Sequence, residues 1–486
     1  MIQALGILLA LLLQGTPPSA AAAPPASLQF GRFGTLPVHR PAGPPSQVVL
    51  LLSAAADSTG TAKMAGELTA WGTLVVVVDV QHYLATTEKS GASCSYPAAD
   101  LETLSHFVEQ KLEVPRYIPP LLVGDATGAT LAYATLAQAP PSTFQGAVTV
   151  GFCPVIQVQR PFCPGNDLHA DRKWAGTGIK LEPATRLESP WIVLDGPACP
   201  EGSAKEFLAP IPAAKLLSVP AVSAASAASA ASVPEDFALL HQAFDSFGAT
   251  RQKEAATAAA RGDLQDLPLV EIPAEGVAKD AFAVILSGDG GWVGLDRKLG
   301  RRLADLAVPV VGLDALTYFW TPRDPEGTAR DLARILEHYF KAWGKSKAIL
   351  VGYSQGADVL PFMVSRLPPE LRARVSLVAL VGPDKEATFD FNFGGWMSDR
   401  PKRPDLPVLP EIPRLQGSPA LCVYANAEKD SPCTRLPPGT AVRLGVPGGH
   451  GFNRDVNIIT DRILKEAGLR PKDAPAPEGA PKPKRN

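Results

Sequence analysis

The sequence predicts an α/β fold, with two doubly wound domains in tandem. Short runs of Val, Ile and Leu alternate with amphipathic stretches, as expected for a parallel sheet that helices cover on both faces. This pattern occurs twice, in blocks at about 28–217 and 266–470. The length of 486 residues fits two or three domains, and 46% apolar residues suffice for their cores. The net charge of −2 argues against nucleic acid as the main ligand.

The N-terminus has the pattern of a signal peptide, which we expect to span residues 1–23. An apolar run at Ala4–Leu13 precedes prolines and the small residues Ala20–Ala23. Ten apolar residues are too few for a stable transmembrane helix. No cysteine precedes Cys94, so a lipoprotein anchor is not expected near the cleavage zone. Export to an oxidising compartment would allow the six cysteines to pair.

Low-complexity segments mark the other domain limits. Residues 218–234 contain only Ala, Ser, Val and Pro, which is typical of a linker. A helical stretch follows at about 235–261, so we assign 218–265 to a linker with a connecting helix. The tail at 471–486 is rich in Pro, Ala and Lys and is expected to be disordered.

The second block shows its elements most clearly. We predict strands at 281–287, 308–313, 347–351, 375–381, 419–425 and 441–446, and helices at 327–343 and 356–367.

The first block repeats this pattern with similar residues in the same order. The matching pairs are Val48–Ser53 with Ala283–Ser287, Val78–Tyr83 with Leu313–Tyr318, Leu121–Gly128 with Ile349–Gly356, and Ser189-Pro190 with Ser418-Pro419. Four matches in order indicate an internal duplication. The alternative is that any two α/β domains share such strands.

The predicted strand 347–351 leads into Gly-Tyr-Ser-Gln-Gly at 352–356, and a helix follows. Gly-x-Ser-x-Gly between a strand and a helix is a nucleophile elbow, a turn so tight that side chains at the glycines would clash. Ser354 is therefore the candidate nucleophile. A serine in an ordinary strand–helix turn is the alternative.

A serine hydroxyl needs a base, and this fold supplies its partners in the chain order Ser, Asp or Glu, His. His450 is the only histidine after Ser354, and it lies in a glycine-flanked loop after strand 441–446. We predict that His450 is the base.

The acid is expected after strand 419–425, in Asn426–Asp430. We choose Asp430 to orient the imidazole, with Glu428 and Asp384 as competitors. Cys422 and Cys433 bracket this loop, and a disulfide between them would fix it, although the sequence does not define the pairing.

Acyl chemistry also needs donors for the oxyanion. The backbone N–H of Gln355 is one candidate. The second is expected from Gly288 or Asp289, in the glycine-rich loop Ser287–Trp292. Nearby aromatic residues either line an apolar pocket or pack in the core: Trp292, Tyr318, Phe319 and Trp320.

The first block lacks these chemical groups. Ala126 occupies the nucleophile position, and Ala54–Asp57 replaces the glycine-rich loop. No Gly-Gly-His context occurs in this block. We expect a catalytically inactive domain that serves packing, substrate gating or partner binding.

Together the motifs resemble the VirJ/AcvB family of exported bacterial proteins. The matches are Ser-Gly-Asp-Gly-Gly-Trp at 287–292, Gly-Tyr-Ser-Gln-Gly-Ala-Asp at 352–358 and Gly-Gly-His at 448–450, with Asp430 and Cys433 like the family's acid loop. The second block resembles VirJ alone, and the full chain resembles the longer AcvB type. The resemblance implies an α/β-hydrolase fold, a periplasmic location, hydrolysis of lysyl-phosphatidylglycerol, and an association with virulence and type IV secretion.

Lysyl-phosphatidylglycerol carries an aminoacyl ester, which suits a serine nucleophile. Its cationic lysyl group favours a nearby carboxylate, for which Asp289 and Asp358 are candidates, with Trp292 and Tyr318 as further substrate contacts. Asp358 has an alternative role in the first turn of a helix, where negative charge is favoured. We expect no metal ion and no cofactor.

Two other functions stay open. The chain could be a non-catalytic periplasmic adaptor that binds secretion-system proteins, or a general carboxylesterase or peptidase. The complete Ser, Asp and His set in only one of two related blocks favours an enzyme.

Overall fold

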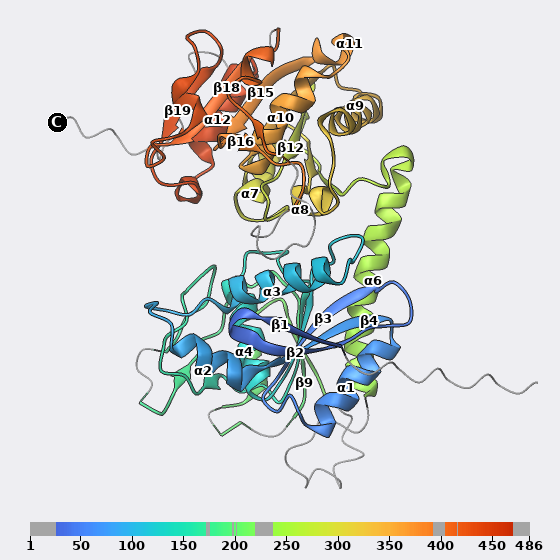
Figure 1. The fold of residues 1–486 in the computed structure, drawn as a ribbon, viewed down its shortest axis with the longest axis vertical. Helices are drawn as coiled ribbons and strands as arrows, with labels where there is room; N and C mark the ends of the chain where they lie inside the picture. The colour runs from blue at the N-terminus through green and yellow to red at the C-terminus, as the bar shows by residue number, and fades with distance from the viewer. Residues whose placement is uncertain are drawn as a thin grey trace, which may run out of the picture.

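Two separate sheets, each flanked by helices, form the structure, which is a computed structural model (Figure 1). It describes residues 26–171, 175–196, 199–200, 202–218, 237–391, 404–415 and 417–469. The expected signal peptide, linker tract 219–236 and tail 471–486 lie outside these residues. Within the described part of the chain, no helix is long and apolar enough to cross a membrane. We call residues 26–260 the first unit and residues 262–469 the second unit.

The first sheet has eight strands in the order β1-β2-β4-β3-β5-β6-β9-β10. Their bounds are Ala26–Phe30 (β1), Gly34–His39 (β2), Gln47–Ser53 (β3), Thr73–Asp79 (β4), Leu121–Asp125 (β5), Gly146–Val150 (β6), Trp191–Leu194 (β9) and Ala214–Leu217 (β10). β2 is antiparallel to β1 and β4, and every pair from β4 to β10 is parallel. Strand β3 is buried along its whole length, which explains its continuous run of Val and Leu.

The second sheet has seven strands in the order β11-β13-β12-β14-β15-β18-β19. Their bounds are Leu269–Ile272 (β11), Ala281–Leu286 (β12), Val310–Leu313 (β13), Lys347–Tyr353 (β14), Val375–Val381 (β15), Ala420–Ala425 (β18) and Val442–Val446 (β19). Only β11 is antiparallel to its neighbour. These bounds agree closely with the strands that the sequence predicts.

Both sheets have the same connectivity. From the antiparallel strand onward, β2-β4-β3-β5-β6-β9-β10 corresponds to β11-β13-β12-β14-β15-β18-β19, and β1 is an addition to the first sheet. The shared order agrees with a duplication. The predicted fold class, two tandem doubly wound units of the α/β-hydrolase type, is confirmed.

In the first unit, helices cover both faces of the sheet. Their bounds are Thr59–Ala70 (α1), Val80–Glu88 (α2), Pro97–Lys111 (α3), Thr127–Gln138 (α4), Ala204–Leu208 (α5) and Ala238–Ala260 (α6). Helices α2, α3 and α4 bury side chains on one face, and α1 and α6 bury side chains on the other. Helix α6, which the sequence places in a connecting segment, packs on this sheet through Leu240, Ala243, Phe244 and Phe247.

The second unit has the same layers. Its helices are Gly294–Asp305 (α7), Ala315–Phe319 (α8), Pro325–Ala342 (α9), Gln355–Ser365 (α10), Pro369–Arg372 (α11) and Asn457–Glu466 (α12). Helices α8, α9 and α10 pack on one face of the sheet, and α7 and α12 pack on the other. Helix α12 follows the last strand of its sheet as α6 follows the last strand of the first sheet.

Short elements complete the description. Two-residue strands pair as Val155–Ile156 (β7) with Ile179–Lys180 (β8), and Glu386–Ala387 (β16) with Leu406–Pro407 (β17). Single 3₁₀ turns occur at Gly31–Phe33 (η1), Gly262–Leu264 (η3), Ile412–Leu415 (η4), Pro432–Arg435 (η5) and Phe452–Arg454 (η6).

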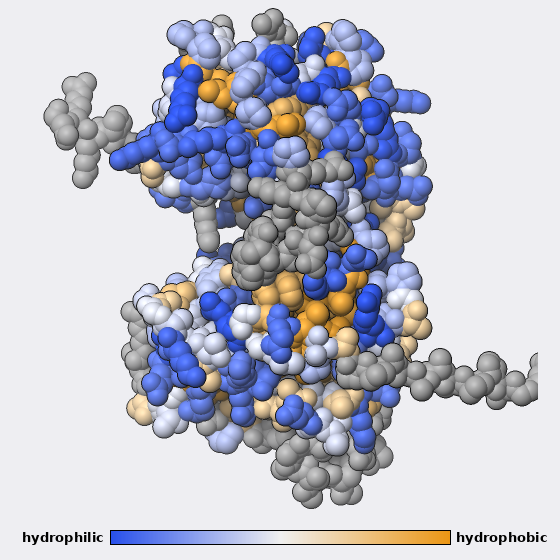
Figure 2. Space-filling model, viewed as in Figure 1, coloured by the Kyte–Doolittle hydropathy of each residue, from blue (hydrophilic) through white to orange (hydrophobic). Residues whose placement is uncertain are grey.

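The two units meet where α3 faces α8 (Figure 1). Trp320 follows α8, is buried, and donates its indole N–H to the Val114 carbonyl oxygen at 2.8 Å. The Trp320 ring packs against Tyr117 of the first unit. Trp320 therefore serves the junction and not a substrate pocket. Figure 2 shows apolar side chains gathered on the viewed face of the first unit, next to the junction.

All six cysteines form disulfides. The pairs are Cys94–Cys163, Cys153–Cys199 and Cys422–Cys433. The first two lie in the first unit. The third connects β18 to η5 and encloses the loop where the sequence predicts the acid.

Candidate active site

The candidate nucleophile lies at the sharp turn between β14 and α10. Ser354 has φ 51° and ψ −122°, a backbone conformation that is strained for any residue with a side chain. A Cβ at Gly352 would lie 2.3 Å from the Gly356 carbonyl oxygen, and one at Gly356 would lie 2.3 Å from the Leu286 carbonyl oxygen. Both positions therefore require glycine, which is the physical basis of the motif.

The structure brings Ser354 and His450 together. His450 Nε2 lies 3.0 Å from Ser354 Oγ, although the two residues are far apart in the sequence. His450 Nδ1 lies 2.8 Å from Glu428 Oε1. With its proton on Nδ1, the imidazole donates to Glu428 and offers Nε2 to accept the serine proton. This is the geometry of a nucleophile, a base and an orienting acid.

The choice of Asp430 as the acid is wrong, because Glu428 occupies that place. Asp430 points to solvent, with 73% of its side chain exposed, and its carboxylate faces Lys385 and Arg435 at 3.4 Å each. The other competitor, Asp384, uses a carboxylate oxygen to accept the N–H of Lys385.

The turn after β18 selects Glu428. Its N–H donates to the Ala425 carbonyl oxygen at 2.9 Å, which folds the chain back at the end of the strand. The neighbouring Ala427 N–H donates to the Gly448 carbonyl oxygen, so the acid loop is joined to the loop that carries His450. The Cys422–Cys433 disulfide closes the same segment. These bonds fix the distance between the acid and the base.

Gly382 is a site residue that the sequence reasoning missed. It follows β15 with φ 66°, and a Cβ there would lie 3.2 Å from His450 Cε1. A side chain at this position would press on the imidazole. The sequence signal was a glycine directly after a predicted strand, at the edge where the elbow lies.

The glycine-rich loop packs beside the serine. A Cβ at Gly288 would lie 3.3 Å from Ser354 Cβ. Among the described residues, no hydrogen bond uses the N–H groups of Asp289 and Gln355. These two donors fit the expected oxyanion role.

The two carboxylates expected to meet substrate differ in exposure. Asp289 is exposed, and within the described structure it makes no hydrogen bond or ion pair. Asp358 is buried, and its carboxylate accepts the Asp384 N–H at 2.6 Å. Burial raises the pKa of Asp358 well above its ordinary value. The expectation that Asp358 binds substrate is therefore corrected: it holds the loop after β15 against α10.

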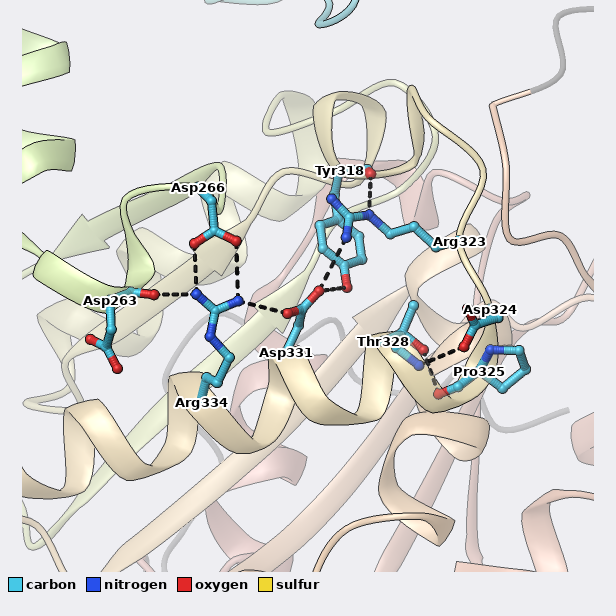
Figure 3. Close-up of polar contacts among 10 residues, drawn as sticks. Asp263, Asp266, Tyr318, Arg323, Asp324, Pro325, Thr328, Asp331 and Arg334 are labelled. Atoms are coloured by element: carbon cyan, nitrogen blue, oxygen red, sulfur yellow. Dashed lines mark hydrogen bonds and ion pairs between the residues drawn. The ribbon is translucent and has the colours of Figure 1, made fainter.

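Tyr318 is likewise structural. It is fully buried, and its hydroxyl donates to Asp331 Oδ2 at 2.7 Å (Figure 3). Arg323 lies over the Tyr318 ring and also contacts Asp331, which in turn accepts from Arg334 (Figure 3). This network joins α8 to α9. The expectation that Tyr318 contacts substrate is therefore wrong.

Trp292 is also mainly a core residue. Its indole fills the space above Gly312, where a Cβ would lie 2.4 Å from the ring. The backbone N–H of Trp292 donates to Asp314 Oδ2 at 3.2 Å. The same Asp314 caps α8 by accepting the Thr317 N–H, so one carboxylate fixes both the glycine-rich loop and the next helix.

The first unit keeps the elbow without the nucleophile. Ala126 has φ 45° and ψ −115°, close to the angles of Ser354. The described part of the chain also has no group of three or more His, Cys, Asp or Glu side chains suited to a metal ion.

Comparison with known proteins agrees with this division. Residues 280–470 match the model of a family described as bacterial virulence protein (VirJ). No curated protein matches the chain. The VirJ part of the expected resemblance is thus supported for the second unit, and the resemblance of the full chain to AcvB stays a prediction.

Several solved structures resemble part of the chain. Est1E from Butyrivibrio proteoclasticus has 11% identity and a TM-score of 0.31, over 42% of this chain and 96% of that chain. A proline iminopeptidase from Mycobacterium smegmatis has 12% identity and a TM-score of 0.31, over 41% and 94%. An α/β serine hydrolase without lid from Xanthomonas campestris has 15% identity and a TM-score of 0.29, over 43% and 90%.

Proposed function

We propose that the protein is a serine esterase that hydrolyses an aminoacyl ester lipid, with lysyl-phosphatidylglycerol as its substrate. The observation that carries the proposal is the contact of His450 with both Ser354 and Glu428, at 3.0 Å and 2.8 Å, on a strained elbow. A serine that serves only packing has no need of a histidine that contacts it on one side and an acid on the other.

In the first half-reaction, Ser354 Oγ attacks the ester carbonyl carbon while His450 Nε2 takes the hydroxyl proton. The carbonyl oxygen becomes an oxyanion, which the N–H groups of Gln355 and Asp289 stabilise. Glu428 holds the imidazole and stabilises its positive charge. The C–O bond to the lipid glycerol then breaks, and His450 gives its proton to that oxygen. Phosphatidylglycerol leaves, and the lysyl group stays on Ser354.

The second half-reaction uses water in place of the serine hydroxyl. His450 removes a proton from water, the hydroxide adds to the acyl carbon, and the oxyanion forms at the same donors. The bond to Ser354 Oγ breaks, and His450 returns the proton to the serine. Free lysine leaves and the enzyme is restored.

Two features support the cationic acyl group. The exposed Asp289 carboxylate follows the glycine next to Ser354, where it can attract an ammonium group. The VirJ match of residues 280–470 agrees with the family from which the substrate is proposed.

We also propose that the protein acts in the periplasm, at the membrane surface, where it meets the lipid. Three disulfides suit an oxidising compartment. A contact with secretion-system proteins belongs to the same proposal and rests on the family resemblance alone.

The test is an assay of the purified full-length protein on vesicles that contain lysyl-phosphatidylglycerol, with release of lysine as the readout. We expect hydrolysis by the wild type and none by Ser354→Ala. A fluorophosphonate probe should label the wild type at Ser354. Hydrolysis of simple esters without hydrolysis of this lipid would indicate a general carboxylesterase. An unlabelled and inert wild type would favour the adaptor function.

A further inference from the structure

A cavity of about 160 Å³ lies at the junction of the two units. The first unit contributes Glu102 and Tyr117 to its wall, and the second unit contributes Gly290, Trp292, Asp314 and Leu316. The wall is mostly apolar, with two carboxylates. Because neither unit encloses the cavity alone, any ligand in it contacts both.

The two carboxylates of this cavity differ in their partners. Asp314 is satisfied by the N–H groups of Trp292 and Thr317. Glu102, which is half-buried on α3, has no hydrogen bond or ion pair among the described residues. Burial and the negative charge of Asp289 raise the pKa of Glu102 to about 7. A partly buried carboxylate without a hydrogen-bond partner lowers the stability of the fold. An apolar side chain at position 102 would fit this cavity wall better.

The cavity adjoins the candidate catalytic residues through the glycine-rich loop. Gly288 of this loop lies against Ser354, and Gly290 lines the cavity. Asp289 lies between them, and its charge acts on Tyr353 and Asp358 near the elbow as well as on Glu102. The glycine-rich loop therefore connects the surroundings of Ser354 with the cavity that Glu102 lines.

We propose that Glu102 of the first unit binds the side-chain ammonium of the acyl group while Ser354 of the second unit attacks its ester. The inference rests on the proposed esterase function and adds the residue that selects the acyl group. Four methylene groups separate the lysyl ammonium from the α-carbon, which lets the charge pass Asp289 and reach the cavity. The apolar wall then suits the methylene chain, and Glu102 suits the charge.

The positive charge of Arg116 does not change the assignment. Arg116 is exposed and acts on Asp314. No ion pair joins Arg116 to Glu102 within the described structure. The Glu102 carboxylate is thus available to a ligand.

The experiment compares ethyl esters of lysine and norleucine, which differ in the side-chain amine. Glu102→Gln in the full-length protein should lower kcat/KM for the lysine ester by about 10- to 100-fold and leave the norleucine ester within about twofold. The matched control is Glu67→Gln, an exposed residue on α1 of the same unit, which should change neither. The melting temperature of Glu102→Gln should equal or exceed that of the wild type, because the variant removes an unpaired carboxylate.

The pH dependence adds a second readout. The ratio of kcat/KM for the lysine ester to that for the norleucine ester should rise as the pH passes about 7, where Glu102 loses its proton, and should be flat in Glu102→Gln. Asp289, Asp314 and Tyr117 also face this region, but they are unchanged in the variant. Their effects therefore appear in both proteins.

The outcomes separate the two proposals. If the wild type hydrolyses both esters and Glu102→Gln changes their ratio by less than twofold, the Glu102 assignment is wrong and the esterase stands. If Glu102→Gln melts earlier and loses both activities equally, Glu102 is a structural residue. If the wild type hydrolyses neither ester nor the lipid, the esterase proposal fails and the Glu102 assignment fails with it.

Discussion

The elbows of the two units have nearly the same backbone. Ala126 and Ser354 have φ of 45° and 51°, and their N–H groups donate to Val150 and Val381 at 3.1 and 3.0 Å. A Cβ at Gly124 would collide with Gly128 as one at Gly352 would collide with Gly356. The elbow geometry is therefore a property of the fold, and it persists where no nucleophile is present.

The surroundings of the two elbows differ. In the first unit, Asp125 precedes Ala126 and its carboxylate accepts the Ala54 N–H at 3.3 Å and the Ser53 hydroxyl at 3.1 Å. Tyr353 stands at the corresponding place in the second unit and donates to the His450 carbonyl oxygen at 3.3 Å. In the first unit, the Asp125 side chain fixes the loop that corresponds to the oxyanion loop of the second unit. In the second unit, the Tyr353 side chain hydrogen-bonds the backbone of the base His450. Chemistry in this fold depends on these neighbours as much as on the serine.

The largest expected effect comes from exchanging the two elbow residues. Ser354→Ala should lower kcat by about 10⁴–10⁶, because the nucleophile is lost, while circular dichroism stays unchanged. Ala126→Ser should add no activity to Ser354→Ala, because no histidine contacts this position among the described residues, and an unactivated hydroxyl is a poor nucleophile. The measurement is ester hydrolysis with fluorophosphonate labelling of both variants. Labelling at residue 126 would show that an elbow serine alone suffices.

The next effect separates the two acids of the loop after β18. Glu428→Gln should lower kcat by about 10²–10⁴, because an amide favours the wrong imidazole tautomer. Asp430→Asn should stay within about threefold of the wild type, because its partners are surface cations. Steady-state kinetics on one soluble ester measures both. A larger loss from Asp430→Asn would restore the acid that the sequence suggests.

A smaller effect is expected at Gly382, which lies against the ring of the base His450. Gly382→Ala should lower kcat about 10- to 100-fold, because the new methyl group displaces the His450 ring. Gly439→Ala is the matched control: its φ is 82°, but nothing lies within 4 Å of a Cβ there. Both variants share the backbone strain, so equal kinetics in the two would exclude the contact with His450.

The smallest effect tests a feature that the units share. Tyr83 donates to Asp100 at 2.8 Å in the first unit, as Tyr318 donates to Asp331 at 2.7 Å in the second. Tyr83→Phe and Tyr318→Phe should each lower the free energy of unfolding by about 1–3 kcal/mol, because each removes one hydrogen bond to a carboxylate that keeps only its arginine partners. Activity of Tyr318→Phe should stay within about threefold. Urea unfolding and ester kinetics measure the two quantities, and a selective rise in KM would return Tyr318 to the substrate site.

The sequence predicts those parts of the structure that depend on local pattern. Strands buried on both faces appear as apolar runs, and the elbow appears because two backbone collisions forbid side chains at Gly352 and Gly356. His450 could be identified because no other histidine follows Ser354. Chain order and strand ends therefore suffice for the nucleophile and the base.

The roles of the other residues depend on contacts between segments that are distant in the sequence or on local turns that the sequence does not show. Glu428 and Asp430 lie in one loop, and only the turn that starts at Ala425 shows which carboxylate faces the imidazole. Tyr318 is a residue type that often lines pockets, but its hydroxyl donates to Asp331. Glu102 comes from the other unit, and no spacing in the sequence connects it with Ser354. Each of these depends on packing that a linear pattern does not contain.

The strained turn at Ala126 also has a consequence for engineering thermal tolerance. Glycine adopts a φ of 45° without steric cost, so Ala126→Gly relieves strain that no reaction uses. At residue 354 the same change would remove the nucleophile. We therefore expect that a change at its elbow makes the first unit more heat-resistant, whereas the second unit cannot be changed at this position without loss of the proposed nucleophile.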